Sequence, residues 1–191
     1  ALSLVAAWQL TVTILVYLAV TTAYSLGLKN VEVLDLVLVA SGFVLRAIGG
    51  AAATGVPISN WFFIVTSFGS LLVVTGKRSG EATDLAGMAG AVRPTLAAYP
   101  ASFLGYVRSV STGVMLVAYC LWAFEQEAAA AARIPLYELS IVPFVVAVLR
   151  YGLLLERGAG AAPEELFLTD RGLQAAMVVW AVTFAAALAA A

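Results

Sequence analysis

The chain has 191 residues, of which 63% are hydrophobic and only 11% charged, and its mean hydropathy is +1.01. A soluble domain is about one-quarter charged, so this composition excludes a water-soluble globule and predicts a protein embedded in lipid. The net charge of -1 argues against a nucleic-acid partner, which calls for a basic face. The absence of histidine excludes histidine acid–base chemistry and histidine metal sites, and the single cysteine, Cys120, excludes an internal disulfide.

Six apolar segments are long enough to cross a bilayer as helices, near 8–27, 33–53, 60–76, 103–124, 135–155 and 172–190. The third is short at its polar end, and we expect it to extend through Lys77. The segments lack strict polar–apolar alternation, which argues against a membrane barrel, and their small residues suit close helix packing. We therefore predict an all-α polytopic membrane helical bundle of about six transmembrane helices, forming one domain over residues 1–191. The apolar start, with neither an initiator Met nor a basic n-region, predicts that the chain begins inside a longer protein.

The cations are distributed unevenly over the five connecting loops. The first, third and fifth loops hold six of them, and the second and fourth hold one, Arg133. The six are Lys29, Lys77, Arg78, Arg93, Arg157 and Arg171. Because cytoplasmic loops are enriched in Lys and Arg, the odd-numbered loops are predicted to face the cytoplasm.

The segment GKRSGEATD, residues 76–84, places charges directly after the third apolar segment. If the helix continues, Lys77, Glu81 and Asp84 share one face. Grouped carboxylates suit Mg²⁺, and Lys77 with Arg78 suits phosphate. The alternative interpretation is a Lys77–Glu81 pair on a helix surface, with the cations reaching the membrane edge.

Arg46 lies deep in the second apolar segment, within VLVASGFVLRAIGGAAA. An arginine at the bilayer centre costs about 3 kcal/mol, so this position needs a reason. Its glycine neighbours predict that it faces the bundle interior, where it would bind an anion. The alternative is a structural pair with a buried acid, and Asp35 is on the same helix face.

Three further groups lie near the membrane edge. Tyr24 and Lys29 close the first segment, where Lys29 is placed to meet a phosphate; the alternative is an ordinary interfacial anchor. Arg150 stands late in the fifth segment and either reaches lipid phosphates or lines the same cavity. Thr169 or Asp170 is expected to cap the last helix. Together these residues favour a cytoplasm-facing pocket for a phosphate-bearing lipid and a second phosphorylated substrate.

The segments YSLGLKN, VLRAIGGAAATGVPISNWF and FGSLLVVTGKRSGE, in this order, resemble the UbiA superfamily of intramembrane transferases. The chain is most similar to the members that act on decaprenyl phosphate. The resemblance implies nine helices, of which this chain holds the last six. It also implies Mg²⁺-dependent transfer of 5-phosphoribosyl from phosphoribosyl pyrophosphate to a polyprenyl phosphate, with release of pyrophosphate. The implied setting is the plasma membrane, with a cytoplasmic active site and a product used for cell-wall arabinan.

By the same resemblance, residues of this chain match motif positions of the superfamily. Lys29, Lys77 and Arg78 are expected to hold phosphates, and Glu81 to bind Mg²⁺ or orient the ribose. Tyr24, Arg46 and Arg150 complete the expected substrate-binding set. The first acidic motif of the family, NDxxDxxxD, would precede Ala1, so we expect this piece alone to be inactive.

Other functions remain open at this point. A UbiA-type aromatic prenyltransferase is the first alternative, although one acid and two cations in KRSGE favour a phosphorylated sugar donor. A membrane transporter with Arg46 on an anion pathway is a second, and an inactive truncated bundle is a third. Prenyl length and assembly as a homo-oligomer are also left open.

Overall fold

The computed structural model describes residues 8–84, 95, 98–130 and 134–190. Within these ranges the chain is helical and contains no strand, so the all-α prediction is confirmed. The long helices are α2 (Trp8–Leu26), α3 (Leu34–Thr54), α4 (Asn60–Asp84), α7 (Ala101–Ala129), α8 (Leu136–Glu156) and α10 (Arg171–Ala190). Two short elements that the sequence did not predict are the 3-10 turn η1 (Leu28–Asn30) and α9 (Pro163–Thr169).

Five helices are long and apolar enough to cross a membrane by length and composition: α2, α3, α7, α8 and α10. The chain is therefore a multi-pass membrane protein. The sixth expected span, α4, is not among the five, because its last two turns carry Lys77, Arg78, Glu81 and Asp84 and lower its hydropathy. It is nevertheless one continuous helix through Gly80, eight residues longer than the predicted segment 60–76.

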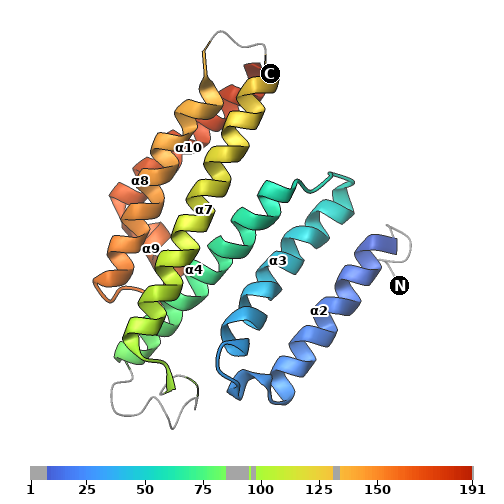
Figure 1. The fold of residues 1–191 in the computed structure, drawn as a ribbon, viewed down its shortest axis with the longest axis vertical. Coiled ribbons are helices and arrows are strands. Elements are labelled where there is room, and N and C mark those ends of the chain that lie inside the picture. Colours follow the sequence, from blue (N-terminus) through green and yellow to red (C-terminus); the bar gives the residue numbers. More distant parts are fainter. Residues whose placement is uncertain (1–7, 85–94, 96–97, 131–133, 191) are drawn as a thin grey trace.

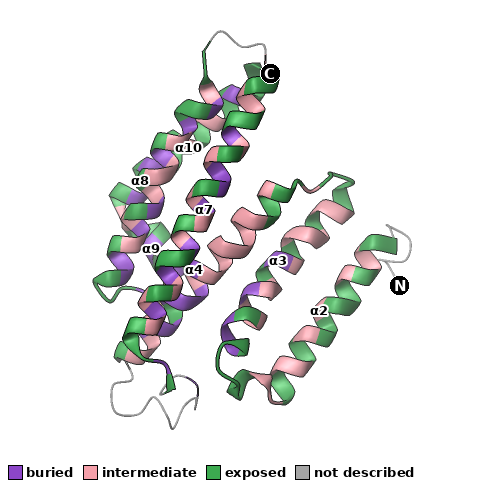
Figure 2. Ribbon diagram, in the orientation of Figure 1, coloured by how far each residue is buried: buried purple, intermediate pink, exposed green. Residues whose placement is uncertain are grey.

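The helices are arranged around α4 (Figure 1). Its most extensive packing is with α7, and α8 packs chiefly with α10. On the other side α3 packs against α4 and then against α2, which is the outermost helix of the described chain. Figure 2 shows the consequence for burial: buried residues concentrate on α4, α7 and α8, while α2 has none.

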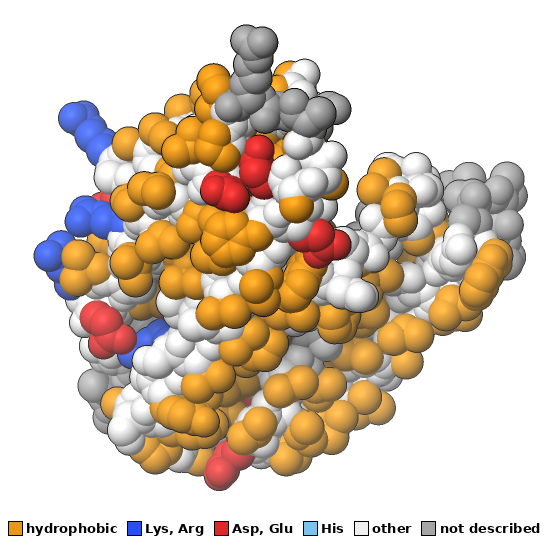
Figure 3. All heavy atoms as spheres, turned by 45° about the horizontal axis from the view of Figure 1, so that its top comes forward, with side chains coloured by type: hydrophobic (Ala, Val, Ile, Leu, Met, Phe, Trp, Pro, Cys, Tyr) orange, Lys and Arg blue, Asp and Glu red, His pale blue; other side chains and the backbone are white. Residues whose placement is uncertain are grey.

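One end of the bundle, which we call the polar end, brings together the junction of α2 with α3, the end of α4, the start of α7 and the segment around α9 (Figure 1). These are the loops expected to lie on the same membrane side. Elsewhere the surface in Figure 3 is mostly hydrophobic, and every long helix exposes Val, Leu or Phe side chains. Such a surface suits contact with lipid tails.

Two glycines allow the last turns of α4 to pack closely against the end of α8 and the segment that follows it. A Cβ on Gly80 would lie 2.1 Å from the backbone nitrogen of Ala161, and one on Gly76 would lie 2.7 Å from the Leu155 side chain. Gly160 in turn approaches the carbonyl oxygen of Gly76 so closely that its own added Cβ would lie 2.3 Å away. Gly80 therefore does not interrupt the helix; it permits a backbone contact that any side chain would prevent.

Candidate functional site

The strongest polar constellation is formed by Tyr24, Asp35, Arg78 and Glu81, which we call the Arg78 cluster. It joins the last turns of α2, the first turn of α3 and the charged end of α4. Arg78 donates from Nε to Asp35 Oδ2 at 2.9 Å and from Nη2 to Asp35 Oδ1 at 3.2 Å. Its Nη1 donates to Glu81 Oε2 at 2.7 Å, and the Tyr24 hydroxyl donates to Asp35 Oδ1 at 2.9 Å.

Because the Arg78 cluster is largely buried, its charged side chains depend on one another for stabilisation. Asp35 is 0% exposed and Arg78 is 5% exposed, whereas the Glu81 side chain is 28% exposed. A buried carboxylate is tolerated only when charges and hydrogen bonds compensate its lost hydration. Asp35 obtains this compensation from a bidentate guanidinium and a phenol hydroxyl. The cluster thereby fastens three helices and holds Glu81 at the edge of the polar end.

The backbone between α2 and α3 is anchored to the residues that precede α7. The backbone N–H of Val33 donates to the Tyr99 hydroxyl at 2.8 Å, and the Thr95 hydroxyl donates to the Lys29 carbonyl oxygen at 3.3 Å. Val33 has a φ of 65°, which is unusual for a β-branched residue and indicates local strain. Burial raises the pKa of Tyr99, so this phenol stays protonated over the physiological range.

Two lysines remain at the surface of the polar end. Lys29 lies in η1 and Lys77 lies on α4, and both side chains are exposed. Glu81 pairs with Arg78 three residues before it, rather than with Lys77 as the alternative interpretation proposed. The arrangement is a fixed carboxylate with two exposed ammonium-bearing residues at one end of the bundle.

Arg46 does not join this cluster. We expected it to face the bundle interior, and for the described residues that expectation is wrong, because its side chain is exposed. Its Nη2 donates to the Tyr17 hydroxyl at 2.7 Å, and its guanidinium lies 5.2 Å from the Tyr17 ring centroid and 5.4 Å from that of Phe43. Asp35, which shares a helix face with Arg46, turns instead to Arg78.

Arg150 is also separate from the cluster. It binds Asp170 in a bidentate manner, from Nε at 3.0 Å and from Nη2 at 2.7 Å. Asp170 simultaneously accepts the backbone N–H of Leu173 at 2.7 Å, which confirms the expected cap of the last helix. These bonds lower the pKa of Asp170 to about 2, chiefly through the hydrogen bond from Arg150. Arg150 thus ties α8 to the start of α10.

The residues present do not form a complete metal site. Among the described residues, no group of three or more His, Cys, Asp or Glu side chains is placed to hold an ion. Asp35 is fully buried and committed to Arg78, and Glu81 is a single carboxylate. The Asp84 side chain lies outside the described part of the chain.

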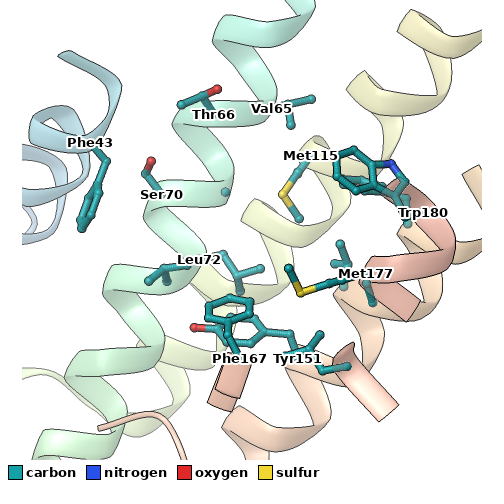
Figure 4. Close-up of a pocket in the computed structure, with 16 residues that line it drawn as sticks. Phe43, Val65, Thr66, Ser70, Leu72, Met115, Tyr151, Phe167, Met177 and Trp180 are labelled. Carbon is teal, nitrogen blue, oxygen red and sulfur yellow. The ribbon is translucent and has the colours of Figure 1, made fainter. Parts of the chain in front are cut away.

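An apolar pocket of about 430 Å³ lies between α4, α7, α8 and α10. Figure 4 shows Thr66 and Ser70 of α4 on one side of it and Met115, Met177 and Trp180 on the other. A second pocket, of about 450 Å³, shares four lining residues with the first: Val65, Thr66, Phe144 and Trp180. The two therefore follow one another along α4. None of the seven predicted site residues lines either pocket.

Sequence reasoning missed the role of Asp35 and Tyr99. A signal for Asp35 was present, because it begins a span at the membrane side that also holds Arg78. Because Asp35 shares a helical face with Arg46, the sequence suggested Arg46 as its partner, whereas its partner in the structure is Arg78. Tyr99 offered no comparable signal, since only the fold brings it to Val33.

Comparison with known proteins adds an independent line of information. No family model matches the chain. It is 41% identical over 197 residues to a decaprenyl-phosphate phosphoribosyltransferase of Mycolicibacterium smegmatis, covering 97% of this chain and 62% of that protein. It is 37% identical over 191 residues to the Mycobacterium tuberculosis protein of the same name, covering 98% of this chain and 62% of that protein. A Corynebacterium glutamicum protein of that name is 36% identical over 165 residues, or 86% of this chain and 50% of that protein. The chain spans about three-fifths of the length of the mycobacterial relatives.

Proposed function

Because this chain is homologous over nearly its whole length to decaprenyl-phosphate phosphoribosyltransferases, we propose that the intact protein transfers 5-phosphoribosyl from phosphoribosyl pyrophosphate to a polyprenyl phosphate. Pyrophosphate is the leaving group. The homology carries this proposal, and the geometry of the polar end supplies its physical support.

The support lies in how charge is arranged at the polar end. Both substrates are polyanions, and they must approach one another for the transfer. Lys29 and Lys77 are exposed there and can meet phosphate oxygens as mobile point charges. Glu81 is held at the same end by Arg78 and is part-exposed, so it can accept hydrogen bonds from ribose hydroxyls.

The proposed reaction forms one bond and breaks one. A phosphate oxygen of the lipid attacks C1 of the ribose, and the bond from C1 to the pyrophosphate oxygen breaks. Negative charge accumulates on the leaving pyrophosphate, where Lys29 and Lys77 stabilise it. Arg78 is a positioning residue in this scheme, because three of its hydrogen bonds already go to Asp35 and Glu81.

Mg²⁺ remains part of the proposal as the cofactor, but the described residues do not build its site. Glu81 is the carboxylate that would contribute a ligand, and the other ligands would have to come from outside the described ranges. When bound, the ion would neutralise pyrophosphate charge.

The apolar pockets along α4 suit the tail of the acceptor. Their walls are almost entirely hydrocarbon and aromatic, with Phe144 and Trp180 shared by both. A polyprenyl chain is hydrocarbon throughout. It can therefore fill these apolar pockets without leaving any of its own groups short of a hydrogen-bond partner. A tail in these pockets would point away from the polar end, leaving the phosphate near it.

The proposed setting is the plasma membrane, with the polar end facing the cytoplasm. In the sequence, the predicted first, third and fifth loops hold six of the chain's ten cations, as expected of cytoplasmic loops. The proposed use of the product is as a cell-wall arabinan precursor.

The test is an assay of the intact protein with phosphoribosyl pyrophosphate and polyprenyl phosphate. Lys77→Ala and Glu81→Ala should each lower kcat/KM about 100-fold, the size seen when one charge-stabilising group is lost. Arg171→Gln, which removes the exposed cation at the first residue of α10, should leave turnover unchanged. Near-normal turnover in both site variants would remove the site assignment, and transfer of a prenyl group from its diphosphate to an aromatic acceptor would replace the proposed reaction.

A further inference from the structure

Arg108 is a buried cation outside the Arg78 cluster. It lies seven residues into α7, about 10 Å along the axis from its start at Ala101. That start belongs to the polar end of the bundle. The residue is only 9% exposed, and its burial therefore requires compensation.

The compensation that the chain provides is incomplete. Arg108 Nη2 donates to Glu156 Oε1 at 2.7 Å, across from α7 to the last residue of α8. Within the described ranges, neither Nε nor Nη1 has an acceptor, although both atoms are buried. Glu156 itself is 66% exposed, so solvent screens its charge. Two guanidinium nitrogens are thus left with unsatisfied donors.

Arg108 is one of the residues that line a cavity of about 430 Å³ between α7 and α8, which we call the Arg108 groove. Gly113 of α7 and Gly152 of α8 line it, and a Cβ added to either would meet nothing within 4 Å. These glycines are therefore not required for close helix packing; they leave the groove open. Leu149 and Leu153 also line it and are exposed, so the groove opens on the lipid-facing surface.

We propose that the Arg108 groove binds the phosphate of a membrane lipid. In the bound state the Arg108 side chain turns towards the groove, and its two unsatisfied nitrogens donate to phosphate oxygens, which is the charge-assisted geometry that guanidinium favours. The lipid's hydrocarbon chain lies along the apolar side of the groove, over Gly152 and Leu153. Glu156 competes with the phosphate for Arg108 and weakens binding.

This site lies outside the Arg78 cluster, and its test measures binding rather than turnover. A lipid phosphate reaches the groove from one of two sources: an anionic phospholipid of the surrounding bilayer, or the polyprenyl phosphate. The chemistry recognised by Arg108 is the same in both cases.

The experiment uses the intact protein, delipidated in detergent, and native mass spectrometry with three separate probes: phosphatidylglycerol, polyprenyl phosphate and diacylglycerol. Arg108→Gln should weaken binding of at least one phosphate lipid about tenfold, the loss expected for a charged hydrogen bond. Gly152→Leu keeps the charge and fills the groove, and it should weaken the same probe similarly. Arg157→Gln, a neighbouring exposed cation, is the matched control and should have no effect.

Glu156→Gln separates this proposal from a purely structural pair. Removal of the competing carboxylate should tighten binding of the phosphate lipid several-fold, whereas a structural pair would only lose stability. The probe that responds identifies the source of the phosphate. Unchanged binding of both phosphate lipids in Arg108→Gln and Gly152→Leu would overturn the proposal, and so would an equal loss of diacylglycerol binding in Arg108→Gln.

Discussion

The ion pair between Asp35 and Arg78 provides the sharpest test of the fold at the polar end. Replacing Arg78 by Met removes three hydrogen bonds to carboxylates and leaves a fully buried Asp35 without its guanidinium. Removing one partner of a buried pair costs about 3–5 kcal/mol, because the remaining charge is uncompensated. Asp35→Leu should cost a similar amount, since Arg78 is only 5% exposed.

The double variant Asp35→Leu with Arg78→Met should be more stable than either single variant. It leaves no buried charge behind, and such replacements are often close to neutral. The assay is reversible unfolding of the intact protein by SDS titration in mixed micelles, followed by circular dichroism. The reasoning is refuted if Arg78→Met costs less than about 1 kcal/mol, or if the double variant loses the sum of the two single losses.

The other predictions concern packing and pH. Gly80→Ala should destabilise the protein by about 1–3 kcal/mol, because its Cβ would meet the backbone of Ala161. The control variant Gly50→Ala adds a Cβ that meets nothing within 4 Å, so it should be neutral or stabilising. Equal unfolding midpoints for the two variants would contradict this prediction. The pKa of Asp170 is lowered to about 2, below the ordinary value near 4, so the bridge to Arg150 stabilises the fold above about pH 4 and is lost as the pH falls towards 2. The difference in melting temperature between wild type and Asp170→Asn should therefore shrink between pH 5 and pH 2, and a constant difference would argue against the bridge.

Much of the fold followed from hydrophobicity alone. The predicted segments 8–27, 33–53 and 135–155 match α2, α3 and α8 within one residue at either end. Apolar length fixes such boundaries because a backbone in lipid must satisfy its own hydrogen bonds. The end of α4 was harder to predict, since its last two turns are polar and contain Gly80. Only the contact with Ala161 explains why a glycine is needed there.

The candidate site was predictable in part. The helix ends that flank the first, third and fifth loops share one end of the bundle, which brings Lys29, Lys77 and Glu81 to the same side. The roles of the arginines were not predictable from the sequence. The helical face on which an arginine lies shows the direction of its side chain, but it does not show which acid the side chain will pair with. Arg46 turned out to be exposed against Tyr17, and Arg150 is engaged by Asp170.

Local composition is enough to predict that this chain lies in lipid, that its spans are helices and that its cations gather on one side. The tertiary structure alone decided which acid neutralises which arginine. Ion pairing depends on distances between helices that are far apart in the chain. Asp35 therefore pairs with Arg78 only once α3 and α4 are packed together. Likewise, the packing of α7 against α8 leaves two guanidinium nitrogens of Arg108 without an acceptor among the described residues.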